Sequence, residues 1–108
     1  MPSDRSGSTL AELLATVESL PWNHSLYLSA DDTTWSLGSL ALVWDQDDVD
    51  DGEATPAVPA SLGMKSVLSI STVQDIVSNR KQQGDWALDD LYVAVLYYYR
   101  NDAFIRVP

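Results

Sequence analysis

Residues 88–100, Leu-Asp-Asp-Leu-Tyr-Val-Ala-Val-Leu-Tyr-Tyr-Tyr-Arg, carry a wide apolar pattern with helical spacing. Aspartates stand in its first turn and Arg100 in its last turn, where their charges suit the helix dipole. The pattern predicts an amphipathic helix that begins at Asp85 or Trp86 and buries one face. That face is formed by Leu88, Leu91, Tyr92, Val95, Leu96 and Tyr99.

A strand and a second helix precede this stretch. Residues 65–70 have the apolar pattern of a strand, and Thr72, with Asp75 three residues later, approximates a capping box. Basic residues followed by Gly84 suit a helix C-terminus. We therefore predict a strand over residues 65–70 and then a helix that is capped by Ser71 or Thr72.

The N-terminal half holds a further helix. Leucine and valine side chains recur at helical spacing over residues 10–20, and Pro21 ends the pattern. Ser8 or Thr9 supplies the N-cap, and Glu12 completes a capping box with Thr9. These features predict an amphipathic helix.

Two strands follow this helix. Residues 25–30 alternate between polar and apolar side chains, as in a half-buried strand. Residues 39–44 are apolar almost throughout, which indicates a more central strand, and the intervening loop predicts antiparallel pairing. Two prolines predict a long irregular connection between Gly52 and Gly63.

The order of these elements predicts an α+β fold in a single domain over residues 1–108. We expect a small, mainly antiparallel sheet of three or four strands, with three helices on one side. The fourth strand would be residues 103–107, and residues 1–7 are expected to be disordered. The last helix should pack on the strands through Leu91, Val95 and Leu96 against Leu40, Leu42 and Leu68, with Leu13 and Val17 closing the core.

An acidic run follows the second strand. Residues 45–53, Asp-Gln-Asp-Asp-Val-Asp-Asp-Gly-Glu, contain six carboxylates in nine positions and no base. Such a run stays in solvent, because an unpaired buried carboxylate is strongly destabilising, and it either serves solubility alone or attracts a basic partner. We predict a partner-binding acidic surface that includes the aspartates of the preceding loop. Its candidate residues are Asp31, Asp32, Asp45, Asp47, Asp48, Asp50, Asp51 and Glu53.

The net charge of -10 arises in the first part of the chain. Residues 6–64 hold ten acids and no base, whereas residues 65–108 hold five of each. This distribution argues against direct nucleic-acid binding and against adsorption on an anionic membrane, since both need clustered Lys and Arg. The absence of cysteine and of an apolar leader favours a soluble, cytoplasmic protein.

No pattern in the chain predicts a catalytic or metal site, so we expect neither an enzyme nor a cofactor. Calcium-loop positions counted back from Gly52 place Val49 and Val58 where oxygen ligands are required. His24 is the only histidine, which excludes a histidine-based zinc cluster. The serines stand in no nucleophile-elbow or triad motif.

Two aromatic residues are candidate contacts for a protein partner. Residues 97–99 are consecutive tyrosines, and successive helical residues point about 100° apart, so at least one ring must leave the buried face. We expect this ring to be Tyr98, which either lies flat on the surface or anchors an interface. Trp35, in a polar loop, is expected to be an exposed contact, whereas Trp44 is expected to be buried.

Three segments form a recognisable scaffold pattern: the Leu-Pro-Trp turn at Leu20–Trp22, the Tyr-Leu strand after it, and the ending Tyr97–Phe104. This pattern resembles a family of small bacterial proteins that includes immunity proteins of contact-dependent growth inhibition systems. The resemblance spans most of the chain but carries no active-site motif. It implies a protein that neutralises a cognate toxin domain by blocking the basic substrate cleft of a nuclease, such as an RNase acting on tRNA.

We expect the protein to be a monomer that binds a basic toxin domain in a 1:1 complex. Three other classes stay open at this point. They are an acidic accessory subunit, a nucleic-acid mimic that acts on another basic protein, and a small-molecule-binding domain.

Overall fold

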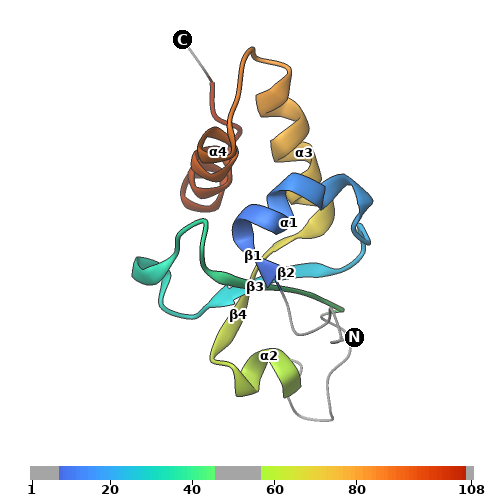
Figure 1. Cartoon of the computed structure of the whole chain (residues 1–108), viewed down its shortest axis with the longest axis vertical. Helices are drawn as coiled ribbons and strands as arrows, with labels where there is room; N and C mark the ends of the chain where they lie inside the picture. Colours follow the sequence, from blue (N-terminus) through green and yellow to red (C-terminus); the bar gives the residue numbers. More distant parts are fainter. Residues whose placement is uncertain (1–7, 46–56, 107–108) are drawn as a thin grey trace.

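The computed structural model describes residues 8–45 and 57–106 and has an α+β fold (Figure 1). The strands are β1 (Ser8–Thr9), β2 (Ser25–Ser29), β3 (Leu40–Trp44) and β4 (Met64–Ser69), and the α-helices are α1 (Leu10–Thr16), α2 (Ala57–Ser61), α3 (Ile70–Lys81) and α4 (Leu88–Asn101). The strands form one antiparallel sheet in the order β1-β3-β2-β4. The predicted fold class is confirmed.

The helices cover the sheet unequally. In Figure 1, α1, α3 and α4 lie above the sheet, and α2 lies below it beside β4. The short helix α2 was not predicted, because it falls within the connection that was expected to be irregular. The rest of that connection and the expected disorder of residues 1–7 lie outside the described residues.

β2 is the most buried strand, because both of its faces are covered. Leu26 belongs to the main core, whereas Tyr27 packs with Leu42 and Met64 in a second, smaller cluster. The alternating burial expected for this strand is therefore absent. Residues 39–44 were expected to form the more central strand. β3 does lie inside the sheet, between β1 and β2, but it is less buried than β2, since it begins with an exposed residue and ends partly buried.

Thr9 begins α1 and also fixes it to the sheet. Its hydroxyl oxygen accepts a hydrogen bond from the Glu12 N–H at 3.2 Å, and its own N–H donates to Glu12 Oε1 at 3.0 Å. This confirms the predicted capping box. Thr9 also pairs with Leu40 in the β1–β3 ladder. The α-helix ends at Thr16, and a 3-10 turn over Val17–Ser19 completes the helical segment.

α3 begins at Ile70, earlier than predicted. Ser69 is its N-cap, and the Ser69 Oγ accepts a hydrogen bond from the Thr72 N–H at 3.2 Å. The Ile70 N–H donates to the carbonyl oxygen of His24 at 2.8 Å. The predicted cap at Ser71 or Thr72 is wrong, because Ser69 ends β4 and caps the helix without an intervening loop.

α4 also departs from its predicted bounds. It begins at Leu88, where the Ala87 N–H donates to Asp90 Oδ2 at 2.8 Å and so fixes the first turn. Asp102, with a φ of 53°, ends the helix in the left-handed region. Residues 103–106 form no strand, so the predicted final strand is absent from this part of the chain.

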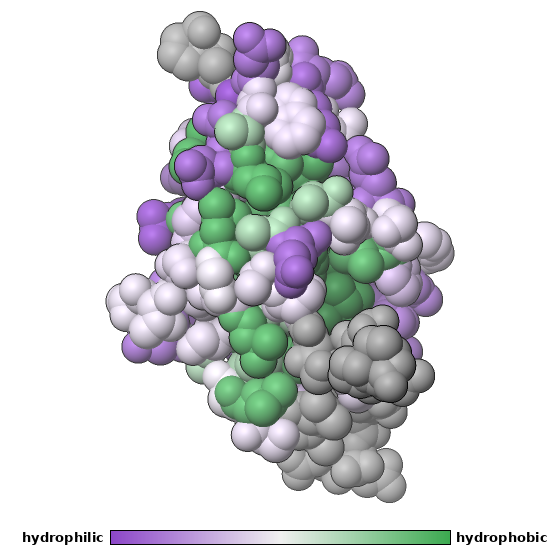
Figure 2. Space-filling model, in the orientation of Figure 1, coloured by the Kyte–Doolittle hydropathy of each residue, from purple (hydrophilic) through white to green (hydrophobic). Residues whose placement is uncertain are grey.

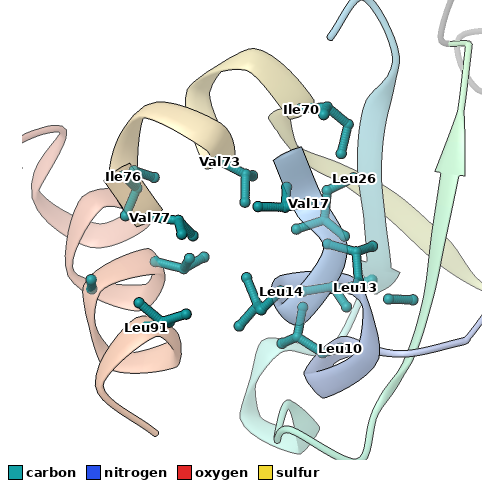
Figure 3. Packing of buried hydrophobic residues seen from close by; sticks show 14 of the residues in the cluster. Leu10, Leu13, Leu14, Val17, Leu26, Ile70, Val73, Ile76, Val77 and Leu91 are labelled. Carbon is teal, nitrogen blue, oxygen red and sulfur yellow. The ribbon is translucent and has the colours of Figure 1, made fainter. Parts of the chain in front are cut away.

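The main core lies between the sheet and the three larger helices (Figure 3). Figure 3 shows Leu14 of α1, Val77 of α3 and Leu91 of α4 pointing into the same interior. Each of these side chains is at most 1% exposed. Leu13 and Val17 are buried in this cluster, as predicted.

α4 packs mainly on α3 and α1, and it meets β4 where Lys65 lies beside Tyr99. Leu91 and Val95 are buried, as predicted, but Leu96 is only partly buried. The expected contacts with Leu40 and Leu42 are wrong. Leu40 is 47% exposed, and Leu42 belongs to the second cluster.

Candidate partner-binding surface

The acidic run starts directly at the end of β3. Trp44, the last residue of β3, is partly buried and pairs with Ser25 of β2. Asp45 follows it and is also partly buried. The sheet therefore fixes the point from which the run departs. The other carboxylates of the run lie outside the described residues; they are Asp47, Asp48, Asp50, Asp51 and Glu53.

Asp31 and Asp32 lie at the other end of β2. Asp45 follows the residue that pairs with Ser25, the first residue of β2, whereas Asp31 comes two residues after Ser29, the last. At a rise of about 3.4 Å per residue, the strand alone separates its two ends by roughly 14 Å. The described members of the predicted acidic surface therefore form two separate groups.

The Asp31 carboxylate has a fixed orientation within its loop. Its Oδ1 accepts hydrogen bonds from the Thr33 hydroxyl at 2.6 Å and from the Thr33 N–H at 3.1 Å, and so caps the 3-10 turn Asp32–Thr34. These bonds, that of the hydroxyl above all, lower the pKa of Asp31 because they stabilise its charged form. Asp31 thus presents an oriented, exposed carboxylate.

The fold brings a base beside these two aspartates. Lys65 lies in β4, and its Nζ is 5.6 Å from the ring centroids of both Trp35 and Tyr99. A hydrogen bond with the Tyr99 side chain raises the pKa of Lys65, and the charges of Asp32 and Asp31 raise it further. Part of the negative charge of this group is therefore compensated.

Trp35 is a core residue rather than an exposed contact. Its side chain is 9% exposed, and its indole Nε1–H donates to the carbonyl oxygen of Ser29 at 2.8 Å. The ring lies 5.0 Å from that of Tyr99. The predicted exposure of Trp35 is wrong, because its neighbours Thr34 and Ser36 occupy the outside of the loop while the indole turns inward.

Tyr97, not Tyr98, is the tyrosine that leaves the buried side of α4. Tyr97 is 40% exposed. Tyr98 is partly buried, and its ring lies 5.4 Å from that of Phe104. The helical spacing correctly required one outward ring, but it does not show that the C-terminal segment packs on Tyr98.

Two further bases are engaged within the fold. Arg80 is 7% exposed; its Nη2 donates to the carbonyl oxygen of Asp85 at 3.1 Å and lies 3.8 Å from the Asp90 carboxylate. Lys81 Nζ lies 3.8 Å from the Glu18 carboxylate. Arg80 and Lys81 are thus each paired with a carboxylate of their own chain, which leaves fewer bases to balance the exposed carboxylates of the predicted acidic surface.

One family model matches this chain. It is described as a domain of unknown function, DUF7716, and it matches residues 7–107. The chain belongs to the DUF7716 family. Comparison with curated proteins and with solved structures gave no match.

The DUF7716 domain also has a groove that sequence patterns did not reveal. Its volume is about 550 Å³, and it lies between the end of α3 and the C-terminal segment. Gln83 Nε2 donates to Asn79 Oδ1 and to the carbonyl oxygen of Ile105, both at 2.8 Å. The bond to Ile105 joins the two walls, although no local pattern links the segments, whereas the bond to Asn79 stays within one wall. The lining residues are Asn79, Gln83, Ala103, Phe104, Ile105 and Arg106.

The described part of this DUF7716 domain comprises residues 8–45 and 57–106. No three His, Cys, Asp or Glu side chains in these ranges are grouped so that they would hold a metal ion. Within the same ranges, no helix has the length and apolarity needed to cross a membrane.

Proposed function

We propose that this DUF7716 domain is an immunity protein that binds and neutralises a cognate toxin domain through its acidic run. The observation that supports this most is the position of Asp45, because the run over residues 45–53 departs directly from a paired strand. The net charge of -10 supports the same class of function. So does the resemblance of Leu20–Trp22 and Tyr97–Phe104 to immunity proteins of contact-dependent growth inhibition systems.

The proposed mechanism is competition for the substrate cleft of a nuclease. Such a cleft uses Lys and Arg to hold phosphates, and carboxylates compete for the same cations. Opposite charges also steer the two proteins together and speed their association. An RNase that acts on tRNA is the toxin that the resemblance implies. Binding, not catalysis, is the activity, and each chain binds one toxin domain in the cytoplasm.

The test compares two variants that each lose three negative charges. The first carries Asp47→Asn, Asp48→Asn and Asp50→Asn, which are central in the run. The matched control carries Asp75→Asn, Asp85→Asn and Asp102→Asn, which are exposed elsewhere on the surface. The partner to be tested is the product of the gene immediately upstream, where the proposal expects a toxin domain.

We expect the first variant to associate about tenfold more slowly at low salt, since steering depends on local charge. The difference from the parent should shrink as salt rises, because ions screen the attraction. Cells that express the first variant should also be less well protected, whereas the control variant should behave as the parent does. Unchanged kinetics and protection in a folded first variant would refute the proposed surface. A parent that neither binds nor protects would refute immunity and favour an accessory subunit.

A further inference from the structure

The outer side of α4 carries a stripe of exposed side chains, which we call the α4 stripe: Asp89, Val93, Tyr97 and Arg100. Val93 is 51% exposed and Tyr97 is 40% exposed. At about 100° per residue, the four positions fall within an arc of roughly 80°. In Figure 2, hydrophobic residues lie among hydrophilic ones over the part of the surface that α4 occupies in Figure 1.

The α4 stripe is complementary to itself. If a second copy of the helix lies antiparallel across a twofold axis between Val93 and Tyr97, Val93 meets Tyr97 of the other copy. The same operation places Asp89 of each copy opposite Arg100 of the other, because the two charges are spaced almost evenly about that axis. A twofold contact uses the same patch on both subunits and requires this self-complementarity. We propose that the α4 stripe is the interface of an antiparallel homodimer.

The charged residues of the stripe are available for such contacts. The ion pairs found across residues 8–45 and 57–106 involve neither Asp89 nor Arg100. The neighbouring Asp90, by contrast, is held by the Ala87 N–H and by Arg80. Opposite charges placed at the two ends of the stripe select the antiparallel orientation over the parallel one.

The distribution of charge favours a second copy at this face. Two proteins of net charge -10 repel each other, but residues 65–108, which include α4, contain five acids and five bases. A contact through α4 joins the neutral parts of the two chains. In Figure 1, α4 lies on the opposite side of the molecule from the end of β3, where the acidic run departs. The α4 stripe therefore lies apart from the point at which the chain leaves β3, and the expected monomer becomes a dimer with one toxin domain per chain.

One partly buried residue beside the α4 stripe, Leu96, would extend its contacts with the second copy. Leu96 is only partly buried within one chain, and its helical position is next to that of Val93 and Arg100. A single pair of crossed helices covers less than the roughly 800 Å² per partner of a standard interface, so the dimer should form reversibly.

The experiment measures the molar mass of the full chain by sedimentation and light scattering from micromolar to millimolar concentration. We expect a reversible monomer–dimer equilibrium for the parent. Asp89→Arg and Arg100→Asp should each weaken dimerisation about tenfold or more, because each places like charges opposite one another at both ends of the interface. An equimolar mixture of these two single variants should dimerise again, since opposite charges then meet at both ends. The control Asp75→Arg makes the same charge change outside the stripe and should dimerise as the parent does.

Three outcomes would overturn the proposal. They are a parent that stays monomeric at millimolar concentration, single variants that dimerise as the parent does, and a mixture of the single variants that fails to dimerise. Circular dichroism checks that each variant is folded. If a charge variant unfolds, Val93→Ser with Tyr97→Ser replaces it, because both side chains are exposed in one chain, and unchanged dimerisation of this variant would equally refute the interface. Toxin binding is measured separately, so the result does not depend on the proposed immunity function.

Discussion

The ring of Trp35 lies 5.0 Å from the ring of Tyr99 and is tilted by 58° to it. This contact joins the loop after β2 to the last turns of α4, which are distant in the sequence. Lys65 Nζ lies 5.6 Å from both ring centroids and ties β4 to the same place. The loop that carries Trp35 therefore helps to hold α4 on the rest of the domain.

Replacing Trp35 by alanine should lower the free energy of unfolding by about 3–5 kcal/mol, since a nearly buried tryptophan is removed from the core. Urea denaturation followed by circular dichroism measures this change. Trp22→Ala is the control, because Trp22 is 68% exposed and its loss should change stability by about 0.5 kcal/mol or less. Equal losses in the two variants would show that Trp35 is not part of the core.

Leu91 and Leu96 differ in depth within α4, and their truncation should show it. Leu91 is 0% exposed, so Leu91→Ala should cost about 2–5 kcal/mol of stability. Leu96→Ala should cost less, because Leu96 is only partly buried. Denaturation at low protein concentration, where self-association is negligible, gives both values. A larger cost at Leu96 would contradict the orientation of α4.

Arg80→Met should leave stability within about 1 kcal/mol of the parent or increase it. It removes a poorly satisfied buried charge, and the Asp90 carboxylate left behind is 46% exposed and still accepts a hydrogen bond from the Ala87 N–H. Arg80 is 7% exposed, and its Nη1 has no hydrogen-bond partner among the residues that the structure describes. Asp90→Ala should cost about 1–3 kcal/mol, since it leaves both Arg80 and the Ala87 N–H without their carboxylate. Thermal unfolding compares the two variants. A greater loss in Arg80→Met would contradict this account.

Tyr92 should make stability depend on pH in the alkaline range. Desolvation raises the pKa of Tyr92, although the nearby charge of Arg100 opposes this. The neutral phenol is thus favoured in the folded state, so its contribution is complete below the unfolded pKa of about 10 and is lost as pH rises through the higher folded value. The free energy of unfolding should fall above about pH 10, and Tyr92→Phe should reduce this fall. An identical pH profile for parent and variant would contradict the role of Tyr92.

Local patterns were sufficient to locate most of the elements. The capping box of Thr9 and Glu12 was predictable, because its two partners are three residues apart. The start of α3 was not, since Ser69, Ser71 and Thr72 are all suitable caps. The packing of the end of β4 decides between these three caps. The Ile70 N–H donates to the carbonyl oxygen of His24, which is distant in the sequence, and this bond fits only a helix that starts at Ile70.

The candidate surface was predictable to a lesser degree. The acidic run over residues 45–53 is visible from composition alone, because charge needs no knowledge of the fold. Exposure of Trp35 and Tyr98 depends on which distant segments cover them, namely α4 and the segment of Phe104. The same limit applies to Lys65, on which the charges of Asp32 and Asp31 act only because β4 pairs with β2 rather than with β3.

Thr9 belongs to the β1–β3 ladder and is also the N-cap of α1. This double use has a practical consequence for recombinant versions of the protein. A truncation that removes Ser8 and Thr9 would delete an edge strand and the start of a core helix in one step. An affinity tag should therefore be joined upstream of Ser8, with both residues retained, so that the domain keeps the hydrogen bonds that begin its fold.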